Sequence, residues 1–146
     1  MACEADRDQY PYGYFADPAT KKPIDEFKSL KIEHGPPRKR FWFVSIPNLK
    51  LQEDLLFVDP KGNEWEVKAG FSFNGGSIPW WAWWLCYPTQ PECLTAFCIH
   101  DKLCVTHECN SIIAAYVFWC AMRANGYYRL GAFRNWFCVF HFGPAF

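Results

Sequence analysis

The chain lacks an excess of charge of either sign. Its 15 Lys and Arg balance its 15 Asp and Glu, and only residues 38–40 form a compact basic cluster. Phosphate binding needs a broader basic surface that releases counterions, so no nucleic-acid partner is expected. The cluster follows two prolines and is typical of a solvated strand entry.

Long apolar runs are also missing. Residues 1–8 contain neither a basic nor an apolar stretch of the kind found in secretory signals, so synthesis in a cytoplasm is expected. The longest uncharged segment with helical character, residues 111–122, is shorter than the roughly 20 residues of a spanning helix. No transmembrane segment is expected.

Aromatic residues and cysteines are abundant instead. Aromatic residues make up 20% of the 146 residues, which is typical of a folded domain, and the length suits one domain. Eight cysteines are many for a reducing cytoplasm. Buried thiols, a metal site, and assembly into a particle that later meets oxidising conditions are three open explanations. Cys86 and Cys93 bracket a short proline-containing loop and are the expected local disulfide if one forms.

The first part of the chain favours strands. Residues 1–38 mix charges with prolines and show no sustained period, which predicts an irregular N-terminal arm before a single domain at residues 39–146. Segments 40–46 and 49–58 are rich in strand-forming residues. Residues 59–63 supply the proline and glycine of a hairpin turn, and the segment after them alternates apolar and charged residues, as a half-buried strand does.

The second part favours helices. A capping box with proline in the first turn predicts a helix over residues 90–105. Asn110 is suited to cap a second, buried central helix that ends at Gly126, and a third helix is expected over residues 129–141. The predicted fold is therefore α+β, with a small hairpin-based antiparallel sheet packed on a C-terminal three-helix unit.

Three motifs follow one another in this chain. Residues 70–79 read Gly-Phe-Ser-Phe-Asn-Gly-Gly-Ser-Ile-Pro, His100-Asp101 lies on the first predicted helix, and residues 121–126 read Ala-Met-Arg-Ala-Asn-Gly. Between about residues 42 and 142 this order resembles the phage and prophage proteins grouped as domain of unknown function 1353. The resemblance implies a phage origin but brings no known reaction.

Two positions depart from that family. Its members commonly carry Asp where this chain has Asn74, and an acidic residue on the second helix where this chain has Ala115 or a close neighbour. Any chemistry that needs those carboxylates is then lost here. The motif loop consists of Asn74, Gly75, Gly76 and Ser77. We expect Asn74 and Ser77 to form one hydrogen-bonded cluster with His100 and Asp101, because a buried loop needs its polar groups satisfied.

The first predicted helix concentrates groups with possible chemistry. His100, Cys104 and His107 fall on one helical stripe, where they are candidate zinc ligands. Alternatively, the cysteine is a small core residue and the helix ends before His107. His100-Asp101 also resembles the His-Asp pair of phospholipases A2, in which the His is the general base and the Asp helps to hold calcium. A structural role for both residues is the favoured interpretation, and no cofactor is expected unless zinc binds.

The function expected from these features is a phage-encoded virion or assembly component of the tail or neck, without enzymatic activity. It would be made in the bacterial cytoplasm and reside in the virion, where it contacts other virion proteins and is a candidate homo-oligomer. One alternative is a small His-Asp or metal-dependent hydrolase of host peptidoglycan or lipid, with His100 and Asp101 as catalytic residues. Another is a host-takeover or anti-defence protein. The candidate interface residues are Trp80, Trp81, Trp83 and Trp84, which core packing would equally explain.

Overall fold

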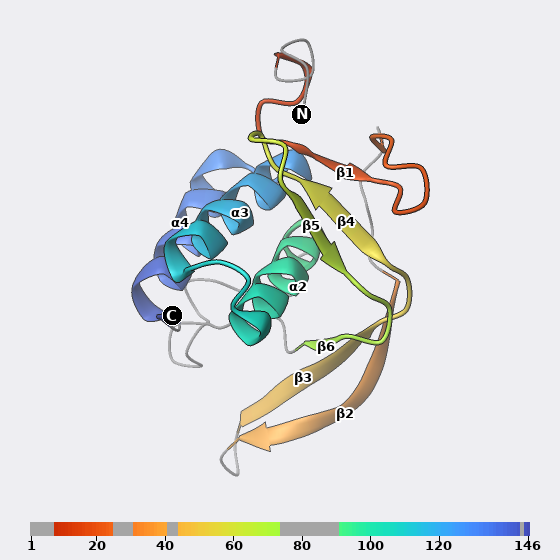
Figure 1. The fold of residues 1–146 in the computed structure, drawn as a ribbon. Helices are drawn as coiled ribbons and strands as arrows, with labels where there is room; N and C mark the ends of the chain where they lie inside the picture. The colour runs from red at the N-terminus through yellow and green to blue at the C-terminus, as the bar shows by residue number, and fades with distance from the viewer. Residues whose placement is uncertain (1–7, 25–30, 41–43, 74–90, 144) are drawn as a thin grey trace.

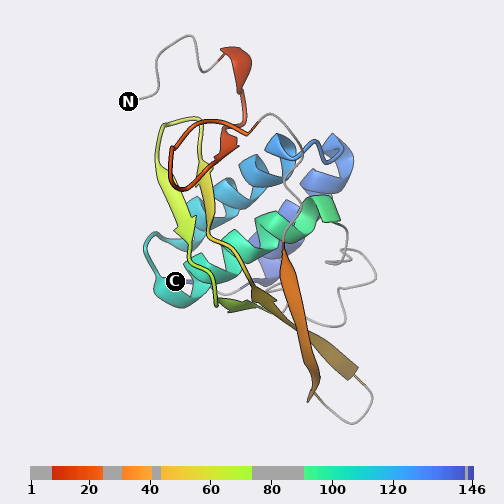
Figure 2. The same cartoon turned by 90° about the vertical axis from the view of Figure 1, so that its right-hand side faces the viewer.

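In the part of the chain that the structure describes, two small sheets are followed by helices. A computed structural model describes residues 8–24, 31–40, 44–73, 91–143 and 145–146. Within them, two three-stranded antiparallel sheets precede the helices in the chain, and one of the sheets lies against the helical layer (Figures 1 and 2). The predicted α+β class is confirmed. In the part of the chain described, no helix is long and apolar enough to cross a membrane.

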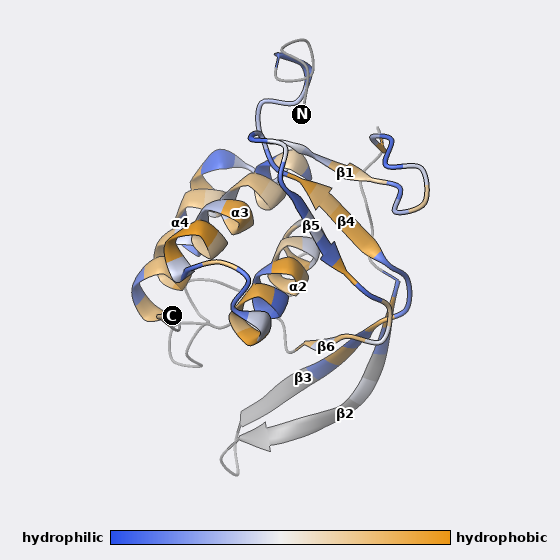
Figure 3. Ribbon diagram, in the orientation of Figure 1, coloured by the Kyte–Doolittle hydropathy of each residue, from blue (hydrophilic) through white to orange (hydrophobic). Residues whose placement is uncertain are grey.

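The first sheet contains the predicted hairpin. Its strand order is β1 (Tyr14–Ala16), β4 (Leu55–Val58) and β5 (Glu64–Val67), with β4 paired to both neighbours. All four residues of β4 are buried, whereas β5 exposes Glu64 and buries Val67. Figure 3 shows this contrast as an orange β4 beside a blue β5. The hairpin therefore supplies apolar surface to the core mainly through β4.

The second sheet is a long ribbon. Its order is β2 (Ile32–Arg40), β3 (Val44–Leu51) and β6 (Ser72–Phe73), and the β2–β3 ribbon extends away from the helices (Figure 1). The pairing register shifts between Gly35 and Arg38. Pro36 and Pro37 occupy that place and have no N–H to donate to the ladder, which accounts for the irregularity.

Two expectations about the strands need refinement. The segment 49–58 forms two strands instead of one, because the chain leaves the second sheet at Leu51 and joins the first sheet at Leu55. The N-terminal arm is not irregular throughout, since it contributes β1 and most of β2. Phe15 of β1 is buried against Phe57 of β4, with ring centroids 5.0 Å apart.

The helices lie close to their predicted bounds. They are α2 (Pro91–Thr106), α3 (Ser111–Ala124) and α4 (Arg129–Phe142). Asn110 caps α3 as predicted, because its Oδ1 accepts a hydrogen bond from the Ile113 N–H at 2.9 Å. Gly126 follows α3 with a positive φ of 79°. Its N–H and that of Tyr127 donate to carbonyls of the last helical turn, which completes the C-terminal cap.

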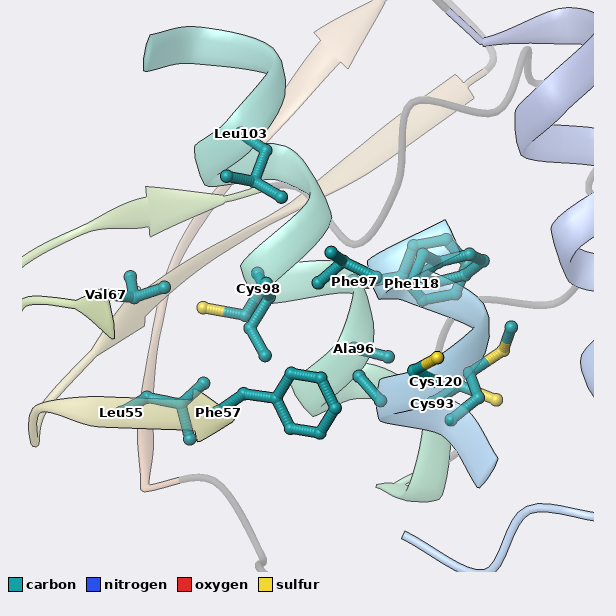
Figure 4. Packing of buried hydrophobic residues seen from close by; sticks show 14 of the residues in the cluster. Leu55, Phe57, Val67, Cys93, Ala96, Phe97, Cys98, Leu103, Phe118 and Cys120 are labelled. Carbon is teal, nitrogen blue, oxygen red and sulfur yellow. The ribbon is translucent and has the colours of Figure 1, made fainter. Parts of the chain in front are cut away.

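The core joins β4, α2 and α3. Figure 4 shows Leu55 and Phe57 of β4 facing Ala96 and Cys98 of α2, with Phe118 of α3 beside Phe97. Phe57, Phe97 and Phe118 are fully buried. A side chain of this size contributes about 1.5–3 kcal/mol when it is removed from water, so these three rings are major contributors to the core.

Asp59 organises the turn of the β4–β5 hairpin. Its Oδ1 accepts from the N–H groups of Lys61 (2.8 Å) and Asn63 (3.0 Å), and its Oδ2 accepts from Trp65 Nε1 (3.0 Å). We expect Asp59→Ala to lower the free energy of unfolding by about 2–3 kcal/mol, because partly buried hydrogen bonds to the buried Asp59 carboxylate are lost. Urea unfolding followed by circular dichroism measures this loss.

The matched control for Asp59→Ala is Glu53→Ala. Glu53 pairs with Lys31 on the exposed surface at 2.6 Å. A surface ion pair contributes at most about 1 kcal/mol, so this control should change stability little. Equal losses in the two variants would show that Asp59 does not hold the turn.

Candidate functional site

His100 and Asp101 lie on α2 and both are buried. The His100 side chain belongs to a residue only 3% exposed, and its ring lies 5.3 Å from the Phe118 ring of α3. Cys104, one turn further along α2, places its Sγ 3.5 Å from His100 Nδ1. The i, i+4 spacing therefore brings two of the predicted residues into contact, as the helical stripe requires.

Burial determines the protonation of His100 and of the nearby Cys98. Removal from water lowers the pKa of His100 to about 4, so its imidazole is neutral near pH 7. Burial, aided by the negative charge of Asp101, raises the pKa of the nearby Cys98 thiol well above its usual value. A base with a pKa near 4 accepts protons weakly, and a protonated thiol is a poor nucleophile. The His100 imidazole is therefore a weak base and the Cys98 thiol a poor nucleophile at neutral pH.

The predicted three-ligand zinc site is wrong. α2 ends at Thr106, and His107 takes a left-handed φ of 52°, which carries its side chain off the stripe. The His107 ring stacks on Phe146 instead, with centroids 4.6 Å apart. Within the described ranges, no group of three His, Cys, Asp or Glu side chains is placed to hold a metal ion.

The cysteines also differ from expectation. Cys93 is a buried thiol whose Sγ accepts a hydrogen bond from Asn135 Nδ2 of α4 at 3.4 Å. The predicted disulfide between Cys86 and Cys93 is therefore not formed, because Cys93 faces the helical core. Cys138 of α4 is disulfide-bonded. The thiols of the described part are Cys93, Cys98, Cys104, Cys109 and Cys120.

Several predicted residues lie outside the described ranges. The proposed contact between the motif loop and His100 consequently stays a prediction, as does the role of the tryptophan cluster. These residues are Asn74, Gly75, Gly76, Ser77, Trp80, Trp81, Trp83, Trp84 and Cys86.

A groove of about 620 Å³ runs between β5 and the end of α2, and neither His100 nor Asp101 lines it. Its wall includes Glu66 and Lys68, which pair with each other at 2.5 Å. Lys102 and Glu108 also line it and pair with each other. Charges neutralised in this way offer little attraction to a charged substrate. The groove is therefore a weak candidate for a catalytic site.

The outer face of α4 is the unusual surface of the described structure. Leu130, Phe133, Phe137 and Phe140 are 76%, 51%, 42% and 43% exposed. Phe133 and Phe137 lie side by side, with ring centroids 6.4 Å apart, and the Phe140 ring stacks on Trp136 at 5.2 Å. We name the side chains of Leu130, Phe133, Phe137 and Phe140 the α4 apolar face. Single exposed apolar residues are ordinary, but a continuous stripe of large ones marks an interaction surface.

The inner face of α4 explains why the large residues point outward. Its buried residues are mostly small: Gly131, Ala132, Asn135, Cys138 and Val139. A Cβ on Gly131 would lie 2.4 Å from the Tyr128 ring, so there is no room for a larger residue at this position. Helical spacing of the aromatic residues was visible in the sequence. The small residues between the aromatic ones were a further signal in the sequence. They predict that the small side of α4 faces the core and the aromatic side faces outward.

The neutral state of His100 predicts a stability that depends on pH. Its pKa in the folded chain, about 4, lies below the ordinary value near 6.5 that the unfolded chain keeps. Between these values the unfolded chain binds a proton that the folded chain rejects. The contribution of neutral His100 to the free energy of unfolding is therefore complete above pH 6.5. It is lost as the pH falls towards 4, by up to about 3 kcal/mol.

The measurement compares unfolding free energies at about pH 7 and pH 4.5 in parent, His100→Gln and His107→Gln proteins. His100→Gln should show the smaller loss on acidification, whereas the control at exposed His107 should behave like the parent. At neutral pH, His100→Ala should cost about 1–3 kcal/mol if its partners stay buried and unsatisfied. An unchanged acid loss in His100→Gln would contradict a buried neutral imidazole.

Comparison with known proteins supports the resemblance seen in the motifs. Residues 49–139 match the family described as "Protein of unknown function (DUF1353)". The "Uncharacterized protein y4jT" of Sinorhizobium fredii (strain NBRC 101917 / NGR234) is 33% identical over 99 residues, which is 67% of this chain and 30% of that protein. The chain thus spans less than a third of that relative's length, and no solved structure matches it. The chain belongs to the DUF1353 family.

Proposed function

We propose that this protein is a phage-encoded virion or assembly component of the tail or neck that works through protein contacts and not through catalysis. The α4 apolar face carries the proposal. The largest exposed apolar patch of a monomeric protein, typically about 300–600 Å², is often functional, and such patches commonly serve as protein interfaces. Aromatic side chains are also the residues that contribute most to binding at interfaces.

The state of His100 favours this proposal over the hydrolase. A catalytic base must reach its substrate and hold a pKa near the working pH. His100 is 3% exposed and its pKa is lowered to about 4, so it meets neither condition in this conformation. In addition, α3 buries apolar side chains at Ala114, Ala115 and Phe118, near the position where the resemblance implies an acidic residue.

Purified protein should not turn over peptidoglycan, phospholipid or phosphoester substrates. The physical reason is the weak, buried base at His100 and the loop amide of Asn74 in place of a carboxylate. The assay follows product release with each substrate in the presence of zinc or calcium. Turnover that His100→Gln abolishes and His107→Gln preserves, in variants that melt like the parent, would establish the hydrolase instead.

Particles purified from a producing culture should contain this chain. Quantitative mass spectrometry would compare its copy number with that of the major capsid protein, before and after a density gradient. A fixed ratio that survives the gradient supports a virion component. Abundance in the lysate with none in the particles would reject that role and leave an assembly factor or a host-directed protein.

A further inference from the structure

We infer that the α4 apolar face binds a second copy of this chain. In this pair the two α4 helices pack antiparallel about a two-fold axis. The inference deepens the proposed function, on which it rests for the premise that this face is an interface. The inference adds that the partner at this face is a second copy of the chain. A two-fold contact requires the same patch on both copies, and the patch must be complementary to itself.

The α4 apolar face has that self-complementary spacing. Leu130, Phe133, Phe137 and Phe140 are separated by three, four and three residues, so the stripe reads the same in both directions. An antiparallel copy in the same register places Phe133 opposite the Phe137 position of the other copy, and Leu130 opposite its Phe140 position. Alternating steps of three and four residues also form the seam along which helices pair in coiled coils.

The ends of α4 suit the antiparallel direction. Arg129 is exposed at the start of the helix, and no acidic residue occurs between it and Phe142. In the antiparallel pair each Arg129 lies beside the last turn of the other helix, whose carbonyl groups carry partial negative charge. A parallel pair would instead bring the two positive N-terminal ends together. The charge pattern therefore selects the antiparallel arrangement.

The apolar area of the α4 apolar face suits a weak dimer. A large apolar side chain covers about 200 Å², so the four exposed fractions give roughly 400 Å² per copy and roughly 800 Å² for the pair. Arg129, Trp136 and His141 flank the stripe on the helix and add to this area. The four apolar residues alone fall below the ~1,200 Å² at the lower end of stable specific interfaces, in the range of weak and transient contacts. A reversible dimer is expected.

The first experiment measures the mass of the full chain by sedimentation equilibrium from about 1 to 200 μM, the range that suits a small interface. The chain should pass reversibly from monomer to dimer within this range. Phe133→Glu and Phe137→Lys, each measured alone, should stay monomeric, because each buries a charge against a phenyl ring in the pair. Ile112→Glu is the matched control, because Ile112 is 64% exposed on α3 and is not one of the four residues of the face. It should dimerise like the parent.

The second experiment mixes the two monomeric variants. In the antiparallel register the introduced glutamate of one copy faces the introduced lysine of the other, while the second Phe133–Phe137 contact stays intact. An equimolar mixture should regain the dimer, and the gain should weaken in high salt. Recovery also shows that both variants are folded. Circular dichroism of each variant gives an independent check on folding.

Three outcomes would overturn the inference. These are a monomeric parent throughout the concentration range, a dimer that neither substitution weakens, and two folded monomeric variants that fail to recover as a mixture. The proposed function is tested separately. A monomeric chain found at fixed copy number in particles would reject only the second copy as partner. A dimer that is absent from particles would reject only the virion role.

Discussion

The contact between Phe97 of α2 and Phe118 of α3, with ring centroids 4.7 Å apart, is the constraint on which the rest of the structure depends. Phe57 of β4 meets the same core, so the sheet and the helices are fixed by one aromatic cluster (Figure 4). His100 lies one turn from Phe97 and against Phe118. Its burial and its neutral state therefore follow from the packing that holds the fold together.

Local signals were sufficient for the helices and the hairpin. Asn110 and Gly126 mark their helix ends through bonds to neighbouring backbone groups, and Asp59 builds its turn from residues within six positions. β1 could not be found in this way, because it is three residues long and exists only through its pairing with β4, more than forty residues later. Such a pairing leaves no period in the sequence.

The candidate site shows the same division between local and distant causes. The contact of His100 with Cys104 followed from helical spacing. His107 leaves the helical stripe because of one backbone φ at the helix end. The thiol of Cys93 accepts a hydrogen bond from Asn135, which lies 42 positions away in the chain. The protonation state of His100 could not be predicted from the sequence either, because its pKa depends on how completely α3 and the sheet exclude water.

The two sides of α4 connect the core to the proposed function. Small residues on the inner side let α4 approach α3 closely, and this leaves the bulk of its apolar surface on the outer side. A helix that is apolar on both sides is favoured only when both sides are covered. The core covers one side of α4 and supplies no cover for the other. Helix packing therefore buries His100 against Phe118 of α3 and at the same time leaves the α4 apolar face exposed, and the proposed contact function rests on that exposed face.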